Sequence, residues 1–201
     1  MELNDEENFQ LSILHGISNW TKGTIFQGNR LLNILNEENA ILIRMGNDIL
    51  NAHNELGSIS EILRWEEDFF IYSIDRAIFF LKQGNKFYPE FTAYISKIES
   101  ELGQGVVKDL RDMRTHIDAY FKGKGKSQKR FMFETNSPVQ NIGGKIISSA
   151  TSTISYPNMN MHLIGGRLNV QKAVKIFCEL KNDIINTCEK YTREMHEKHL
   201  P

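Results

Sequence analysis

The chain has 201 residues, enough for one domain with a sizeable core, whereas two independent domains would be cramped. Its 25 acidic and 24 basic side chains nearly cancel, so a nucleic-acid role has to rest on a local basic patch. No apolar run approaches the roughly 20 residues of a membrane span, and the start, "MELNDEENF", lacks the basic region of a signal peptide, so we expect a cytoplasmic protein with no membrane partner.

The first half of the chain is predicted to be helical. Apolar residues at helical spacing over 5–36 predict one long helix, or two with a glycine-rich joint. A further helix is predicted over about 38–56, with Gly57 placed to end it. Ser58 and Glu61 then form a capping-box pattern before a central core helix that continues to Lys82. The apolar stripe of that helix comprises positions 59, 62, 63, 69, 70, 74, 77, 78 and 81.

A group of aromatic side chains on the central helix favours a core position, or a core plus a dimer face, over a base-stacking platform. These are Trp65, Phe69, Phe70, Phe79 and Phe80. With so many large apolar residues on one helix, some are expected to serve an oligomer interface.

Two more helices are predicted before the composition changes. Pro89 suits the first turn of a helix that continues to about residue 102, and Gly103 and Gly105 interrupt or kink the chain after it. An apolar stripe then predicts a helix from Val106 to Phe121. The next segment, "KGKGKSQKR", has five basic residues and no acid, and ends the helix.

The region that follows is rich in β-branched and small residues, with turn signals between them, and predicts two or three short strands. Asn169 is placed to cap a last long helix. On that helix, Cys178 and Cys188 are about 15 Å apart, too far for a mutual disulfide, which indicates reduced thiols. The predicted fold is mainly α: an antiparallel helical bundle in one domain, 1–201, with a core over about 5–121 and 169–198 and a β-rich insertion over about 130–165.

The segment "LRDMRTHIDAY", residues 110–120, holds the most concentrated set of reactive side chains. On an ideal helix Asp112 and His116 stand at i and i+4, so the carboxylate can orient the imidazole and favour its protonated form. Arg111 points about 140° away from His116, so the two converge only if the helix loosens or a second copy completes the site. Arg114 lies nearer the boundary of the core stripe.

A guanidinium fork with a nearby imidazole suits phosphodiester chemistry. A face of alternating Arg and Asp is also typical of a solvated, salt-bridged helix surface, and spacing alone favours that reading.

"RDMRTH", Arg111 to His116, resembles the signature of HEPN-domain proteins: an arginine, a polar Asn, Asp or His, three further residues and a histidine. The family is an α-helical bundle with this signature near the end of a late helix. Many members are metal-independent endoribonucleases of toxin, antiphage and RNA-processing systems, and they usually act as dimers whose two motifs meet in a shared cleft.

The resemblance implies a role for each residue of the motif. Arg111 would bind the scissile phosphate, Asp112 would position the histidine, and His116 would be the acid or base. It also implies an RNA substrate, a homodimer with a composite active site, no cofactor or metal, and in toxin systems an antitoxin or regulatory protein as a further partner. Members paired with nucleotidyltransferase antitoxins carry a tyrosine two residues after the histidine. Here that position is Asp118, the first tyrosine is Tyr120, and the β-rich insertion lies outside the minimal bundle.

Basic residues directly follow the motif helix, where they could draw an RNA backbone towards His116. They are Lys122, Lys124, Lys126, Lys129 and Arg130, and Arg114 is the other candidate RNA contact. A flexible, solvated loop is the alternative reading of this run.

The remaining histidines carry weaker signals. His196 and His199 lie one helical turn apart, but no cluster completes a metal site and a frayed terminus is the simpler reading. His15, His53 and His162 are isolated and expected at capping, surface or partly buried positions. The alternative to the ribonuclease is a catalytically inactive helical module that binds RNA, a nucleotide or a protein partner. A third reading is an interaction protein whose motif is only a salt-bridged face.

Overall fold

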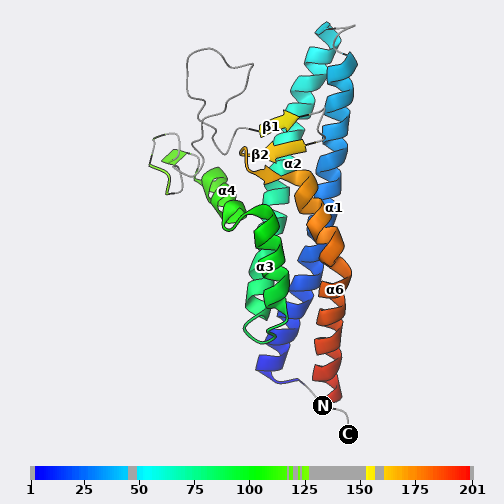
Figure 1. Ribbon diagram of the computed structural model, residues 1–201, viewed down its shortest axis with the longest axis vertical. Helices are drawn as coiled ribbons and strands as arrows, with labels where there is room; N and C mark the ends of the chain where they lie inside the picture. The colour runs from blue at the N-terminus through cyan, green and yellow to red at the C-terminus, as the bar shows by residue number, and fades with distance from the viewer. Residues whose placement is uncertain are drawn as a thin grey trace.

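Two long helices, α1 (Asp5–Arg44) and α2 (Ile49–Gly84), form an antiparallel pair that spans the length of the molecule (Figure 1). The computed structural model describes residues 3–44, 49–116, 118–119, 122, 124–126, 153–156 and 161–199, and for 49–52 and 153–156 the backbone alone. Helix α6 (Val170–Glu197) packs along α1, and α3 (Phe91–Leu102) packs against both α2 and α6. The short helix α4 (Val106–Thr115) makes its main helix contact with α2, and it leans outward from the bundle (Figure 1).

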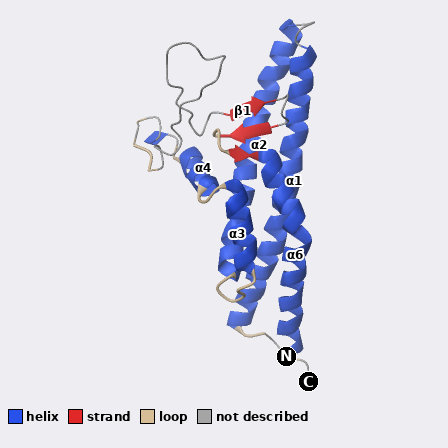
Figure 2. Cartoon of the chain, in the orientation of Figure 1, coloured by secondary structure: helices blue, strands red, loops and turns tan. Residues whose placement is uncertain are grey.

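A small antiparallel sheet precedes the last helix (Figure 2). Strand β2 (Met161–Ile164) lies between β1 (Thr153–Tyr156) and β3 (Leu168–Asn169). The strands run directly into α6, where the Asn169 side chain accepts a hydrogen bond from the Lys172 backbone N–H at 2.8 Å. This confirms the predicted cap, and it confirms a mainly helical fold with a small sheet before the last helix. The sheet extends past residue 165, and residues 130–152 of the predicted insertion lie outside the described part.

The core is formed where α1, α2 and α6 approach most closely. Its largest fully buried side chains include Leu14, Leu31, Phe70 and Phe177. Gly28 of α1 lies at this contact, because a Cβ there would stand 2.8 Å from the Phe70 ring and would also meet Val174 of α6. The glycine lets three helices meet without a side chain between them.

Gly28→Ala should lower the free energy of unfolding by about 1–3 kcal/mol, the usual cost of overpacking a rigid core. The neighbours that it would meet are a buried ring and a β-branched side chain, neither of which can turn aside. Gly57→Ala is the matched control. Gly57 is exposed inside α2, and a Cβ added there would have no atom within 4 Å, so alanine should raise stability by roughly 0.5–1 kcal/mol. Urea denaturation of both variants measures the contrast, and equal effects would contradict this account of the packing.

Three predicted boundaries in the first half are wrong. Helix α1 continues through its glycines to Arg44, so the helix predicted over 38–56 is divided between α1 and α2. Gly57 does not end a helix and Ser58 does not cap one, because both lie within α2. A single glycine costs a helix about 1 kcal/mol, which the packing of a 36-residue helix overrides.

The predicted core stripe of α2 is also wrong in part. Leu63, Phe70 and Ile74 are buried, but Ile62 and Phe69 are 51% and 57% exposed. Of the aromatic group, Phe70 is fully buried, whereas Trp65 and Phe79 are exposed. Helix α2 therefore carries apolar side chains on two faces, of which one packs in the core.

Helix α4 ends earlier than predicted. Its last residue is Thr115, and His116 is the C-cap, with φ −116° and ψ 39°. Asp118 and Ala119 are helical again, while Ile117, Tyr120 and Phe121 lie outside the described residues. The motif therefore spans a helix end, with Arg111 inside the helix and His116 just beyond it.

Candidate functional site

Helix α4 places Arg111 over α2 between two carboxylates. Its Nη1 donates to Asp75 Oδ2 at 2.8 Å, and its Nη2 and Nε donate to Asp112 Oδ1 at 2.6 and 3.1 Å. The hydrogen bond to Asp112, supported by Asp75, raises the pKa of Arg111 above its usual value. The side chain remains 31% exposed. Arg111 is thus a fixed, permanently charged fork at the surface, and an anion that binds it must compete with Asp112.

His116 is exposed and is not held by Asp112 through its ring. The Asp112 carboxylate accepts hydrogen bonds from Arg111, and within the described residues none from the His116 imidazole. The contact between the two residues is a backbone bond from the His116 N–H to the Asp112 carbonyl oxygen at 3.0 Å. Among the described residues the expected carboxylate–imidazole pair is therefore absent: the Asp112 carboxylate is bonded to Arg111, and His116 has a non-helical backbone conformation at the C-cap.

Arg114 is largely enclosed. Its Nη2 donates to Glu67 Oε2 at 2.6 Å and its Nη1 to Asp68 Oδ1 at 2.5 Å, and 11% of its side chain is exposed. Burial lowers the pKa of Arg114, but the attraction of Glu67 and the hydrogen bonds to Glu67 and Asp68 outweigh it and raise the pKa overall. An RNA contact by Arg114 stays a prediction, and it would require a phosphate to displace Asp68.

A shallow pocket of about 210 Å³ separates α2 from the motif side of α4. Its lining residues are Asp68, Ile71, Tyr72, Arg111, Arg114 and Thr115. Its lining combines the apolar side chains of Ile71 and Tyr72 with two arginines, and His116 follows Thr115 along the chain. We call it the α2–α4 pocket.

Behind the α2–α4 pocket lies a buried ionic cluster that was not predicted from the sequence. Glu67 is 2% exposed, and its Oε1 lies 2.8 Å from Nε2 of His162 on β2, while its Oε2 accepts from Arg114. His162 is itself 2% exposed, and its backbone N–H donates to the Gln171 side chain of α6 at 3.0 Å. Glu67 therefore joins the sheet to the motif helix.

One sequence signal could have located the acidic residues of this cluster. In "EED", residues 66–68, two acids stand at the helical positions of the buried stripe, and a buried carboxylate requires a cation or hydrogen-bond donors. Glu66 is 5% exposed and accepts hydrogen bonds from Gln27 and Arg30 of α1, the latter at 2.5 Å. The partners of Glu67 are about 47 and 95 residues away, which spacing rules do not reach.

Glu38 of α1 faces the same cluster, and burial, with a smaller contribution from Glu67, raises its pKa. The folded state holds this proton more tightly than the unfolded chain. Glu38 therefore lowers the free energy of unfolding as the pH rises above about 4.5, and it does not change that free energy below this pH. Glu38→Gln should therefore raise the melting temperature at pH 7 and leave it nearly unchanged at pH 4. Glu37→Gln, at the exposed neighbouring position, is the control. Equal shifts at both pH values would contradict the burial argument.

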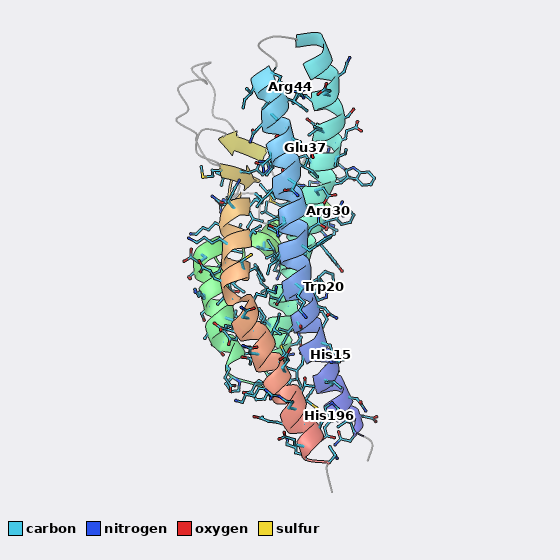
Figure 3. All side chains as sticks on the ribbon, turned by 90° about the vertical axis from the view of Figure 1, so that its right-hand side faces the viewer. His15, Trp20, Arg30, Glu37, Arg44 and His196 are labelled. Carbon is cyan, nitrogen blue, oxygen red and sulfur yellow. The ribbon has the colours of Figure 1, made fainter. Side chains whose placement is uncertain are left out.

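The other predicted residues are placed less closely together. Lys122, Lys124 and Lys126 are exposed beyond α4, and Lys129 and Arg130 lie outside the described residues. His199 is bonded to Glu7 at 2.9 Å, which ties the end of α6 to the start of α1, and Figure 3 shows His196 at that same end of the bundle. In the described part of the chain, no group of three or more His, Cys, Asp or Glu side chains is arranged to hold a metal ion. No helix there has the length and apolar content for a membrane crossing.

Comparisons with known proteins add no relative. No protein-family model matches the chain, and neither a curated protein nor a solved structure matches it.

Proposed function

We propose that the chain is a HEPN-like, metal-independent endoribonuclease that acts as a homodimer, in a toxin or antiphage defence system. The observation that supports it most is the placement of Arg111. A surface guanidinium, held from below by Asp75, borders the α2–α4 pocket, and an exposed histidine follows at the end of the same helix. This arrangement offers one group for a phosphate and one for a proton.

In the proposed reaction His116 accepts the proton of a ribose 2′-hydroxyl, whose oxygen attacks the adjacent phosphorus. Arg111 stabilises the negative charge that develops on the phosphorane. The bond to the 5′-oxygen breaks, that oxygen takes a proton from water, and His116 returns its proton to the solvent. The products are a 2′,3′-cyclic phosphate and a 5′-hydroxyl, and atoms and charge balance without an oxidant or a cofactor.

The second chain of the dimer supplies what one chain lacks. On an ideal helix Arg111 and His116 point about 140° apart, so we propose that the Arg111 of one copy acts with the partner's His116. Arg114, Lys122, Lys124, Lys126, Lys129 and Arg130 are proposed to contact the RNA backbone, and an antitoxin or regulatory protein is a further proposed partner.

A catalytically inactive module is the second candidate, and one observation favours it. Four carboxylates, of Glu67, Asp68, Asp75 and Asp112, surround the two arginines, which weakens the field that would attract RNA. Incubating purified protein with labelled RNA in EDTA separates the candidates. Cleavage supports the ribonuclease, and a mobility shift without cleavage supports an RNA-binding module. The absence of both cleavage and a shift supports a protein-binding module.

A further inference from the structure

One exposed face of α2 carries a row of five apolar side chains and one arginine. Its members recur at alternating intervals of three and four residues, which is the spacing of a helix-pairing seam. They are Ile62, Trp65, Phe69, Tyr72, Arg76 and Phe79, and we call them the α2 seam. The five apolar members are 41–69% exposed.

The exposed area of the α2 seam is large for a single chain. Aromatic side chains offer about 150–250 Å² each, so these exposed fractions leave on the order of 500 Å² of apolar surface in one row. That lies in the upper part of the range of about 300–600 Å² for the largest apolar patch of a typical monomer, a patch that is often functional, and it approaches the roughly 800 Å² that each partner buries in a standard interface. Surface beside the row would supply the remainder.

We propose that a second copy of this chain covers the α2 seam, with the two α2 helices antiparallel and the two-fold axis between Phe69 and Tyr72. This inference deepens the proposed function, on which its catalytic consequence rests. In this register three kinds of contact repeat about the axis: Phe69 with the partner's Tyr72, Trp65 with the partner's Arg76, and Ile62 with the partner's Phe79.

Charge decides between the antiparallel and the parallel pairing. Arg76 is the one cation in the seam. Its Nη2 donates to Asp75 Oδ2 at 2.9 Å, and its guanidinium lies over the rings of Tyr72 and Phe79, at 5.5 and 4.7 Å from their centroids. A parallel pair would place Arg76 against the partner's Arg76, whereas the antiparallel pair places it over the indole of the partner's Trp65. The groove that receives it, about 340 Å³ in volume, is bordered by the exposed carboxylate of Glu61, whose charge suits a cation, and by Glu66, which is already bonded to Arg30.

The elements on either side of the α2 seam determine which parts of the partner come near Arg111 and His116. Asp68 and Asp75, on one flank, are bonded to Arg114 and Arg111, so α4 lies on that side. On the other flank lies α1, through Arg30 bonded to Glu66 and Trp20 packed edge-on against Tyr72 (Figure 3).

A two-fold axis perpendicular to α2 keeps both α4 helices on one side of the interface, whereas a parallel pair would set α4 beside the partner's α1. The axis also lies between the levels of Asp68 and Asp75. Arg111 of one copy therefore stands near the level of the partner's Arg114, with the partner's His116 next along that chain. The antiparallel seam thus brings together the two residues that one chain keeps apart.

Cysteine cross-linking tests the orientation. Ile62→Cys and Phe79→Cys are each made in a Cys178→Ser background, which removes the exposed native thiol. Mild oxidation of an equimolar mixture should yield a covalent dimer. Neither variant alone should do so, because positions 62 and 79 are about 25 Å apart along the helix. Self-cross-linking of either variant alone, or no cross-link in the mixture, would overturn the proposed pairing.

Sedimentation without RNA tests the interface separately from cleavage. The wild type should sediment as a dimer and Phe69→Glu as a monomer. Phe9→Glu, at a similarly exposed phenylalanine near the start of α1, should remain a dimer. A monomeric wild type would overturn the interface, whatever its activity on RNA. A dimer that cleaves no RNA would leave the interface standing and remove the proposed function, and full cleavage by monomeric Phe69→Glu would overturn the shared site.

Discussion

Replacing His116 with alanine is expected to lower the rate of RNA cleavage by about 10²–10⁴-fold, the usual contribution of one general acid or base. His116 is exposed beyond the last turn of α4 and contacts the rest of the chain mainly through its backbone, so its side chain can be removed without unfolding the helix. Initial rates on a labelled RNA, with circular dichroism of each protein, measure the effect. His15→Ala, at an exposed histidine of α1, should cleave at the wild-type rate. Full activity of His116→Ala would remove it from the mechanism.

Arg111 requires a second variant, because its removal also takes the bonded guanidinium from Asp112 and one of two from Asp75, which keeps Arg76. Arg111→Ala should abolish cleavage, with a loss of about 10²–10³-fold or more for one oxyanion-stabilising group. Arg111→Lys keeps the charge but not the fork, and should restore the fold and only a small part of the rate. Arg193→Ala, at an exposed position on α6, is the control. Restoration of the full rate by lysine would show that only the charge matters.

Replacing Glu67 with alanine is expected to lower the free energy of unfolding by about 3–5 kcal/mol, since it removes the carboxylate from a buried ionic cluster. Arg114 and His162 both bind this carboxylate, with 11% and 2% of their side chains exposed. The loss should loosen both the sheet and α4 from α2. Equilibrium denaturation in urea measures it.

Two variants separate charge from shape at this position. Glu67→Gln keeps the volume and one acceptor, so its loss should be smaller than that of alanine. Glu61→Ala, at an exposed glutamate on the same helix, should change stability by less than about 0.5 kcal/mol. A loss for Glu67→Ala no larger than for Glu61→Ala would show that the cluster does not stabilise the fold.

The elements that sequence predicted correctly are those specified by local chemistry. The cap at Asn169, the long periodic stripe of α6 and the β-branched strands before it each depend on residues a few positions apart. The errors have a different origin. Gly57 carries a helix-ending signal and Ser58 a helix-starting signal, but each is worth about 1 kcal/mol, and the packing of α2 against α1 exceeds it.

The candidate site shows the same division. Arg111 and His116 are candidates because of their spacing in the sequence. Arg111, on α4, lines the α2–α4 pocket, and His116 lies just beyond the last residue of that helix. Glu67 and His162 were not found, because their contact joins α2 to a strand far along the chain. The sequence predicts a core, or a core plus a dimer face, for the aromatic group of α2, and does not separate the buried face from the exposed one, because an apolar stripe does not reveal whether its partner is the same chain or another.

Mixing two inactive variants tests the central claim, a shared RNA-cleaving site, most directly. Arg111→Ala and His116→Ala are purified separately, combined in equal amounts, allowed to exchange subunits and assayed on labelled RNA in EDTA. Half of the dimers are then mixed, and each mixed dimer has one site with both residues intact, so about a quarter of the wild-type rate should return. The products should carry a 2′,3′-cyclic phosphate. A mixture that remains as inactive as its components, beside a wild type that cleaves, would contradict the shared site.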